Sequence, residues 1–281
     1  MPRTLRELVS WATHELQLVS PSARLDAEIL LAHVLDRDRA YLLTWPDRVL
    51  PDAQRLEFQQ LVQRRGEPQP VAYLVGYREF YSLRLQTTPA TLVPRAETEQ
   101  LVDAALARIA GSDCRRVIDL GTGSGAIALA IKRHAPSCNV TATDIDPAAL
   151  AVARANGEQL DLKIDWVESD WFGAFDPATR FDLVVSNPPY VPLNDPYLGQ
   201  GDLPAEPRRA LVSGARGLDA IEQIIQTAPA FIRPGGWLLL EHGYDQQQPV
   251  AQLMTQRGLD AVETQHDLND LPRITLGRWP G

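Results

Sequence analysis

This sequence contains few cysteine and histidine residues. Its 281 residues include two cysteines, Cys114 and Cys138, which match no metal-ligand spacing, and five histidines without a triad or metal spacing. We therefore expect no metal, and we expect both cysteines to stay reduced as small packing residues. No stretch approaches the length of an apolar transmembrane helix, and no signal-peptide pattern opens the chain. These absences predict a cytoplasmic protein without a membrane partner.

The sequence also lacks an excess of positive charge. Its formal net charge is −9; residues 1–70 contain nine basic and ten acidic side chains, and residues 71–281 contain 18 and 26. Proteins that bind naked nucleic acid usually carry the opposite sign, because neutralisation of phosphates drives that binding. The acidity therefore argues against a direct nucleic-acid substrate, although it leaves room for a small basic cleft.

The first 75 residues follow a helical pattern and predict a small helical domain. Thr4 and Glu7 fit a capping box, and the apolar residues that follow have helical spacing. We expect the break at residues 20–22 to end this helix and Ser22 to cap a second one. Further signals predict a short helix after Asp38, a helix with Pro51 at its first position that ends near residue 65, and one turn over residues 71–75.

Between residues 76 and 94 the apolar period changes to two, which predicts a β-hairpin connector. Phe80, Leu83 and Leu85 alternate before a polar turn at residues 87–89, and Leu92 follows.

Residues 95–281 alternate between predicted strands and helices. This order indicates an α/β fold, in which a parallel sheet is covered by helices on both faces. Two late strands without an intervening helix suggest an antiparallel pair at the sheet edge. The predicted strands are 116–120, 139–144, 162–167, 181–186, 237–241, 260–265 and 273–278, and the predicted helices are 97–109, 125–134, 147–156, 218–231 and 246–257.

A glycine-rich loop joins the first of these strands to its helix. Gly121-Thr122-Gly123-Ser124-Gly125 permits a tight turn, so the backbone N–H groups can approach a ligand without Cβ interference. Asp144 ends the next strand, where a carboxylate can accept hydrogen bonds from both ribose hydroxyls. The region therefore predicts an adenosine-containing cofactor. The loop alone also fits NAD; Asp119 favours a methionine moiety, because it can meet an ammonium group and would repel a pyrophosphate.

The acceptor site is predicted from Asn187-Pro188-Pro189-Tyr190, at the end of the strand over residues 181–186. An amide-type nitrogen is a poor nucleophile and must be held with its lone pair toward the methyl donor. The Asn187 side-chain oxygen and the Pro188 carbonyl can accept its two N–H bonds. The two prolines preset the carbonyl direction, and Tyr190 can cover the flat face of the amide. Hydrogen bonds that strengthen as the nitrogen becomes positive stabilise the transition state without a strong base.

Almost end to end, these features resemble the release factor glutamine methyltransferases, the HemK/PrmC family. The motifs that carry the resemblance are residues 76–80, 92–99, 119–130, 169–172, 186–190, 206–207 and 240–243, with Arg273. Ala96 departs from a usual proline, and Ala205 from a usual aromatic residue before Glu206-Pro207. The second departure leaves the loop over the substrate less defined.

The resemblance implies a seven-stranded, Rossmann-like class I methyltransferase domain over residues 95–281, behind a helical docking domain (1–75) and the connector (76–94). It implies methylation of the glutamine amide in the Gly-Gly-Gln motif of bacterial peptide chain release factors, with S-adenosylmethionine as donor and S-adenosylhomocysteine as product. The residues implied to bind the cofactor are Gly121, Thr122, Gly123, Ser124, Gly125, Asp144, Trp171 (near the adenine) and Asn187. Pro188, Pro189 and Tyr190 are implied to hold the glutamine with Asn187, and the catalytic residues are Asn187, Pro188 and Tyr190.

Other functions remain open at the level of sequence. A glutamine methyltransferase of a ribosomal protein would use the same chemistry, and so would a nucleic-acid methyltransferase acting on exocyclic amines, which needs a basic surface and base flipping. An NAD-dependent oxidoreductase lacks evident proton-relay residues, and a catalytically dead binding module conflicts with the intact tetrapeptide. We expect Glu97, Glu99 and Glu241 to be structural acids, and we give His242 no role.

Overall fold

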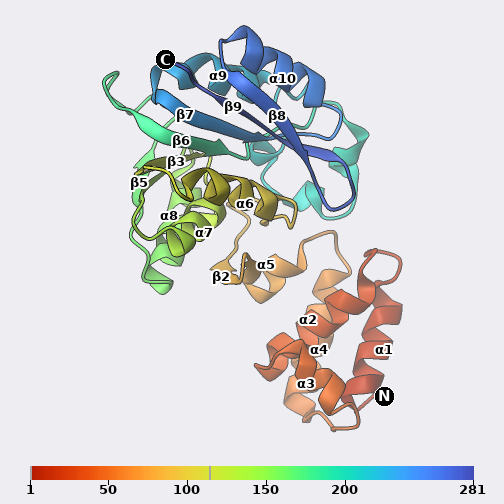
Figure 1. Ribbon diagram of the computed structural model, residues 1–281. Helices are drawn as coiled ribbons and strands as arrows, with labels where there is room; N and C mark the ends of the chain where they lie inside the picture. The colour runs from red at the N-terminus through yellow and green to blue at the C-terminus, as the bar shows by residue number, and fades with distance from the viewer. Residues whose placement is uncertain (1, 114) are drawn as a thin grey trace. The chain divides into compact units, whose positions relative to one another are not determined.

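The computed structural model describes residues 2–113 and 115–281 and divides the chain into two compact units (Figure 1). One unit comprises residues 1–77 with 196–206, and the other comprises residues 78–195 with 207–281. Cys114 lies outside the described residues, whereas Cys138 is fully buried. The boundaries expected after residues 75 and 94 stay predictions.

The first unit is built from helices around one apolar core. Thr4 caps α1 (Leu5–Leu16) in a capping box with Glu7, as predicted, and α1 buries Leu5, Leu8, Ala12 and Leu16 at helical spacing. Asp38 caps α3 (Arg39–Thr44) through the N–H of Tyr41 at 2.9 Å. The remaining helices are α2 (Ala23–Leu35), α4 (Asp52–Arg65) and α5 (Val71–Val75).

Two predictions about the ends of these helices are wrong. Ser22 occupies the N-cap position of α2, but its backbone is not extended and its side chain caps no backbone N–H; its hydroxyl donates to Asp26 Oδ1 at 3.1 Å. Pro51 lies just before α4 rather than at its first position.

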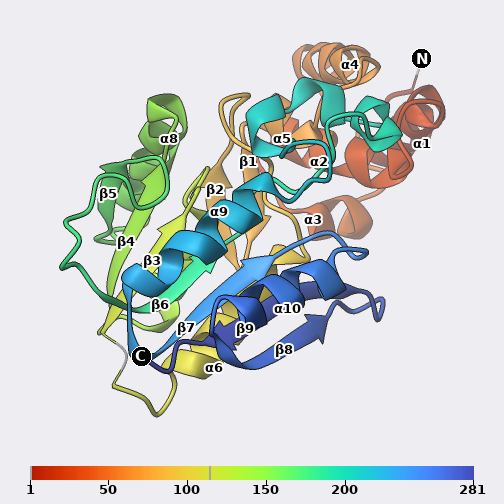
Figure 2. The same ribbon diagram turned by 90° about the horizontal axis from the view of Figure 1, so that it is seen from above.

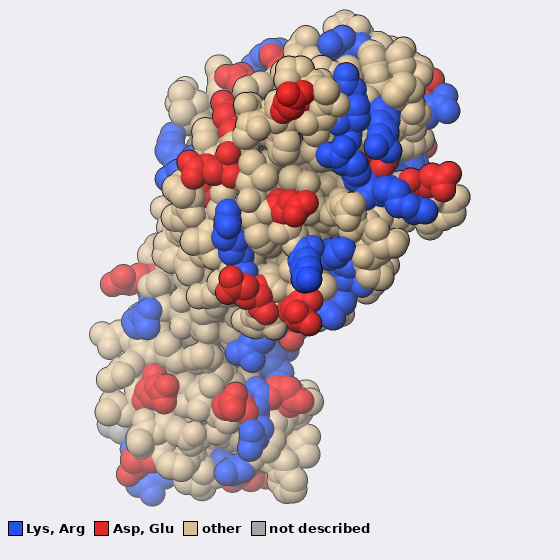
Figure 3. All heavy atoms as spheres, turned by 90° about the vertical axis from the view of Figure 1, so that its left-hand side faces the viewer, with Lys and Arg blue, Asp and Glu red and all other residues tan. Residues whose placement is uncertain are grey.

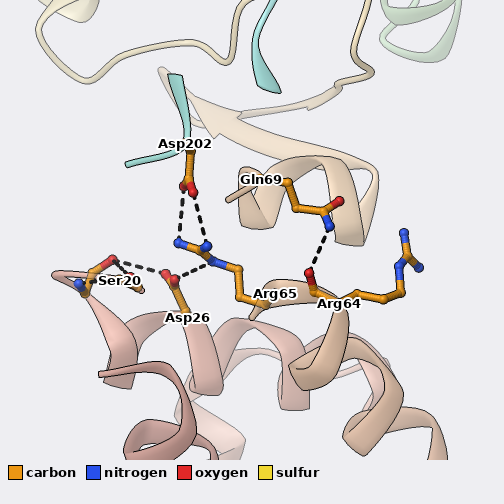
Figure 4. Close-up of polar contacts among 7 residues, drawn as sticks. Ser20, Asp26, Arg64, Arg65, Gln69 and Asp202 are labelled. Carbon is orange, nitrogen blue, oxygen red and sulfur yellow. Dashed lines mark hydrogen bonds and ion pairs between the residues drawn. The ribbon is translucent and has the colours of Figure 1, made fainter. Parts of the chain in front are cut away.

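A buried arginine holds the segment of residues 196–206 within this unit (Figure 4). The Nε of Arg65 donates to Asp26 Oδ2 at 2.8 Å, and its two terminal nitrogens lie 3.1 and 3.2 Å from the oxygens of Asp202. The Arg65 and Asp26 side chains are 2% and 7% exposed. A charge buried to this degree requires paired carboxylates, so Arg65 ties α2 and α4 to a segment far away in the sequence.

The connector forms a hairpin of β1 (Tyr77–Phe80) and β2 (Leu83–Gln86), with its turn earlier than predicted. Tyr81 and Ser82 occupy the turn with φ of 49° and 60°, whereas residues 87–93 form no strand. Two successive left-handed residues are typical of a type I′ turn, which usually carries Asn-Gly. The sequence lacks that signal. Glu99 supports this turn instead, by accepting the N–H of Tyr81 at 2.8 Å.

The second unit contains a seven-stranded sheet with strand order β5-β4-β3-β6-β7-β9-β8. The strands β3 (Arg116–Leu120), β4 (Asn139–Asp144), β5 (Asp165–Glu168), β6 (Phe181–Ser186) and β7 (Ile232–Glu241) pair in parallel, and β8 (Asp260–His266) and β9 (Pro272–Arg278) are antiparallel, as predicted. The strand expected from residue 162 begins only at Asp165, because the Leu162 N–H donates to Gly157 O at the end of the preceding helix.

Helices cover both faces of this sheet (Figure 2). Along β6, Leu183 and Val185 face one core while Val184 faces the other, which is the alternation expected of a strand buried on both sides. The helices of the first core include α6 (Thr98–Ile109) and α7 (Ala126–His134), and those of the second include α9 (Asp219–Thr227) and α10 (Gln247–Gln256). Asp146 caps α8 (Pro147–Gln159), which packs against β4 and β5. Short 3-10 turns lie at Pro196–Gly199, Leu203–Ala205, Arg208–Ala210 and Ala228–Ala230.

We expect Arg65→Met to lower the free energy of unfolding by about 3–5 kcal/mol, because it leaves the buried Asp26 carboxylate without its cation. Proteolytic cleavage within residues 196–206 should also accelerate. Urea unfolding and timed proteolysis measure the two effects. Arg24→Met is the matched control: Arg24 pairs with Glu28 at 3.0 Å but its side chain is 72% exposed, so the loss should stay below about 1 kcal/mol. Equal effects of the two substitutions would contradict the anchoring role.

Candidate active site

Parallel strands end together at one edge of the sheet, and the loops after them form the candidate site. Leu120 of β3 lies beside Thr143 of β4 and Ser186 of β6, and Ser186 lies beside Leu240 of β7. The carboxyl edge of a parallel sheet is where α/β folds bind their ligands. At this edge of the sheet Gly121 follows β3 and Asn187 follows β6, while Asp144 and Glu241 are the last residues of β4 and β7.

The glycine loop has the conformation for which its glycines were predicted. Gly121, Gly123 and Gly125 have φ values of 69°, 57° and 84°, in the left-handed region that side chains disfavour. A Cβ on Gly121 would lie 3.4 Å from the indole ring of Trp171, whereas one on Gly123 would meet nothing within 4 Å. The loop therefore presents bare backbone beside an aromatic ring, and open space lies over its middle glycine.

Asp144 links this loop to the end of β4. Its Oδ2 accepts the N–H of Gly123 and its Oδ1 accepts the N–H of Asp146, each at 2.9 Å. Burial raises the pKa of Asp144, while these two N–H groups and the Arg209 guanidinium counteract the shift. A carboxylate has about four lone-pair directions, so two remain for hydroxyl donors from a ligand.

Asp119 lies beneath the loop and is fully buried. Its Oδ2 accepts from the Thr122 hydroxyl at 2.6 Å and from the Ala128 N–H at 3.2 Å. Its Oδ1 has no hydrogen-bond partner among the described residues. Burial, with a smaller contribution from nearby Asp144, raises the pKa of Asp119 to about 7 against those two hydrogen bonds. The predicted contact of Asp119 with an ammonium group stays a prediction, but an unpartnered buried oxygen suits a cationic ligand.

A cavity of about 760 Å³, its open mouth included, brings most of these residues together. Six residues predicted from the sequence line it: Gly121, Gly123, Asp144, Trp171, Asn187 and Pro189. Five others do not: Thr122, Ser124, Gly125, Pro188 and Tyr190. Among those five, Thr122 and Ser124 hold the loop in place through the Thr122 hydroxyl and the Ser124 carbonyl, which accepts from Asn156 Nδ2 at 2.9 Å.

Trp171 is held in an unusual backbone conformation at the cavity wall. Its φ is 47°, which costs roughly 1–3 kcal/mol for a residue with a side chain. The Ser169 hydroxyl stabilises it by donating to the Trp171 carbonyl at 2.9 Å and accepting the Ala174 N–H at 3.0 Å. Strain retained at a cavity wall points to a functional position for the indole ring, and the predicted adenine contact stays a prediction.

The acceptor tetrapeptide leaves β6 with its first and last residues anchored. Asn187 Nδ2 donates to the Thr98 hydroxyl at 3.0 Å, which leaves the side-chain oxygen available for another donor. The Tyr190 hydroxyl lies 3.4 Å from Glu241 Oε1, and the Tyr190 carbonyl accepts from Gln246 Nε2 at 3.0 Å. The amide of Asn187 is therefore oriented by the protein before any ligand binds.

Several residues of the site were missed by reasoning from the sequence. Arg209 lines the cavity and pairs with Asp146 at 3.2 Å, and residues 90–92 of the connector line another part of its wall. Asp146 lies two residues after a predicted strand end and directly precedes Pro147, so its position was a usable signal. Arg209 lies in a short 3-10 turn within a long connection that has no periodic pattern, and no sequence signal identified it.

Residues 2–113 and 115–281 contain neither the side-chain arrangement of a metal site nor a helix that could span a membrane. No cluster of His, Cys, Asp or Glu in that part of the chain is arranged to hold a metal ion. No helix there has the length and apolar character needed to cross a membrane.

Both units match known protein families. Residues 7–76 match the PrmC N-terminal domain, and residues 98–196 match the methyltransferase small domain. The chain is 51% identical to a release factor glutamine methyltransferase of Xylella fastidiosa, over 92% of this chain and 94% of that protein. It is 48% identical to a release factor glutamine methyltransferase of Pseudomonas aeruginosa over the same shares.

A solved structure shares the fold of the second unit, which contains the candidate site and is called the catalytic unit below. A 16S rRNA methyltransferase of T. thermophilus in complex with AdoMet and guanosine superimposes with a TM-score of 0.54 at 21% identity, covering 72% of this chain and 49% of that one. At this identity the likeness concerns the fold alone.

We expect Asp144→Asn to weaken the binding of an adenosine-containing ligand about 10- to 100-fold, because an amide replaces a charged acceptor and turns one N–H toward a backbone donor. Isothermal titration with S-adenosylhomocysteine measures the affinity. Asp182→Asn is the matched control, since Asp182 also accepts two backbone N–H groups, from Arg115 and Arg116, but at the opposite edge of the sheet. Unchanged affinity in the Asp144 variant would remove this residue from the binding site.

Proposed function

Because the chain belongs to the family of release factor glutamine methyltransferases, we propose that it methylates the side-chain amide nitrogen of the glutamine in the Gly-Gly-Gln motif of bacterial release factors. One observation carries the assignment of this reaction to the site. The acceptor tetrapeptide follows β6, the glycine loop follows the adjacent β3, and Gly121 and Asn187 line the same cavity. A donor on the loop and an acceptor on the tetrapeptide would therefore meet.

The residues present fit S-adenosylmethionine, which supplies an electrophilic methyl group on sulfur and leaves as S-adenosylhomocysteine. The space over Gly123 admits a ligand against the backbone, and Asp144 keeps lone pairs for the ribose hydroxyls. The indole of Trp171 offers a flat apolar surface for the adenine. The unpartnered Oδ1 of Asp119 suits the ammonium group of the methionine portion, directly or through water.

The tetrapeptide orients the acceptor. Thr98 occupies the Nδ2 group of Asn187, so the Asn187 oxygen and the Pro188 carbonyl accept the two N–H bonds of the glutamine amide. These bonds strengthen as the nitrogen gains positive charge, which stabilises the transition state. Tyr190 covers the face of the amide, and exclusion of water protects the weak nucleophile.

The charges of the catalytic unit support a protein substrate over a nucleic acid. Many of its surface arginines are paired, as in Arg278 with Asp260 at 2.8 Å and Arg216 with Glu222 at 2.6 Å. Acidic side chains lie among the basic ones on the face drawn in Figure 3. Paired arginines are less available for phosphates, so this distribution disfavours the base-flipping alternative. The cytoplasmic location expected from the sequence accords with such a substrate and stays a prediction.

The substrate is tested with radiolabelled S-adenosylmethionine and purified release factor, ribosomal proteins or RNA. We expect label on the release factor, at its Gly-Gly-Gln glutamine. Asn187→Ala should reduce kcat by about 100- to 1,000-fold, because one preorganised acceptor is lost, and should keep cofactor affinity within about tenfold. Label on RNA but not on the release factor would refute the proposal. Equal loss of affinity and turnover would make Asn187 mainly a cofactor residue.

We propose that the helical unit docks the release factor. Leu43, Trp45 and Val49 of this unit are large apolar residues that are more than half exposed. Exposed apolar side chains of this size mark interaction surfaces when they gather.

The pair Leu43→Ser and Trp45→Ser should raise KM for intact release factor about tenfold and leave KM for a short Gly-Gly-Gln peptide unchanged, since only the intact protein reaches the helices. Steady-state kinetics on both substrates measure the difference. Leu18→Ser, at a 92% exposed position of the same unit, is the control. An equal rise for both substrates, or no rise, would contradict the docking role.

A further inference from the structure

A buried glutamate lies behind the acceptor tetrapeptide. Glu241 is the last residue of β7, at the same sheet edge as the tetrapeptide, and is 1% exposed. Its Oε1 lies 3.4 Å from the hydroxyl of Tyr190, and its Oε2 has no hydrogen-bond partner among the described residues. The side chain does not line the cavity. Any influence of Glu241 on the reaction must therefore pass through its neighbours.

Thr98 connects the same carboxylate to the other end of the tetrapeptide. Thr98 is the first residue of α6, is buried, and accepts a hydrogen bond from Asn187 Nδ2 at 3.0 Å. The Thr98 side chain also lowers the pKa of the Glu241 carboxyl group, which is the effect of a hydroxyl that donates toward a carboxylate. A hydroxyl has a single proton, so a Thr98 that donates to Glu241 must present its lone pairs to Asn187. The bonds run in one direction, from Asn187 through Thr98 to Glu241.

This direction matters for the chemistry. With Nδ2 of Asn187 committed to Thr98, the side-chain oxygen is the atom left for the acceptor amide. Without an acceptor beyond it, the Thr98 hydroxyl could rotate and donate to Asn187, which would favour the flipped side-chain amide. A flipped Asn187 would turn N–H groups toward the N–H groups of the substrate.

Packing alone gives no reason for a carboxyl group here. The neighbouring strand residues Leu238, Leu239 and Leu240 are fully buried and apolar, and an apolar residue would also end β7. Burial raises the pKa of Glu241 to about 7, against the hydrogen bonds from Thr98 and Tyr190 and the charge of Arg273. A carboxylate kept in such surroundings is more often found at functional sites than elsewhere.

We propose that Glu241 is a positioning residue for methyl transfer, whose carboxylate fixes Asn187 through Thr98 and fixes Tyr190 through its hydroxyl. The inference rests on the proposed function, because it takes Asn187 and Tyr190 as the residues that hold the acceptor. It differs from the expectation drawn from the sequence, in which Glu241 was a structural acid only.

The test compares Glu241→Gln with Glu241→Met. Glutamine keeps an acceptor oxygen for Thr98 and Tyr190 and places its NH2 at the unpartnered Oε2 position, so kcat should stay within about tenfold of the wild type. Methionine keeps the length and removes both acceptors, so kcat should fall about 100-fold, the usual cost of a misplaced reacting group. Affinity for S-adenosylhomocysteine should change less than about threefold in both variants. A purely structural role would instead lower kcat and cofactor affinity together.

The pH profile gives a second readout that does not depend on the methionine variant. Because the pKa of Glu241 is raised to about 7, the carboxylate is lost as the pH falls below 7, and kcat of the wild type should fall toward the value of the Glu241→Gln variant, which carries the same neutral acceptor oxygen. This acid limb should be absent in Glu241→Gln. The titratable or charged groups that face Glu241 are Tyr190, Glu97 and Arg273, the last paired with Asp267 at 2.9 Å. Asp119, whose pKa is also raised to about 7, would act on cofactor affinity, so kcat is measured at saturating S-adenosylmethionine.

Asp182→Asn, at the opposite end of β6, controls for the loss of a carboxylate and should keep both kcat and the acid limb. An acid limb that persists in Glu241→Gln would overturn the inference, and so would a Glu241→Met enzyme with kcat within threefold of the wild type. Either result leaves the proposed function intact if Asn187→Ala is inactive. A wild-type enzyme that does not label the release factor would instead refute the proposed function itself.

Discussion

The parallel register of β4, β3, β6 and β7 is the constraint on which the site depends. The strands pair so that their carboxyl ends lie at one level, and each is followed by a different chemical group. The glycine loop follows β3, a carboxylate ends β4, and the tetrapeptide follows β6. Because both faces of the sheet are buried under helices, a strand cannot slip by one residue without turning its apolar side chains toward the wrong core. The register that stabilises the core therefore also fixes the distance between donor and acceptor sites.

Regular elements could be predicted from the sequence because their signals are local. Three examples are the buried apolar runs of β3 and β6 and the capping box at Thr4. Each is recognisable from a few consecutive residues, and each was predicted at its observed bounds. The glycine loop and the tetrapeptide were found for the same reason: each directly follows a strong strand signal.

The errors arose where the decisive partner is distant. The hairpin turn lies at Tyr81 and Ser82 because Glu99, 18 residues away, accepts a turn N–H. Ser22 makes no side-chain cap because its backbone is not extended, and its hydroxyl donates instead to Asp26, which Arg65 holds. Arg209 reaches the cavity from a short 3-10 turn through a pair with Asp146. Glu241 was predicted to be a structural acid, because its neighbours Thr98 and Tyr190 are distant in the sequence and approach it only in the folded chain. Local patterns cannot report such partners.

The segment after the tetrapeptide belongs to a different compact unit from the tetrapeptide itself. Residues 196–206 begin six positions after Tyr190, yet they pack within the helical unit, where Asp202 pairs with the buried Arg65. The glycine loop and the tetrapeptide follow strands of the sheet, whose fold is shared with an rRNA methyltransferase. The chain that leaves the acceptor site is thus held by the unit that matches the PrmC N-terminal domain. Loss of the helical unit would therefore also release residues 196–206, which follow the tetrapeptide closely in the sequence.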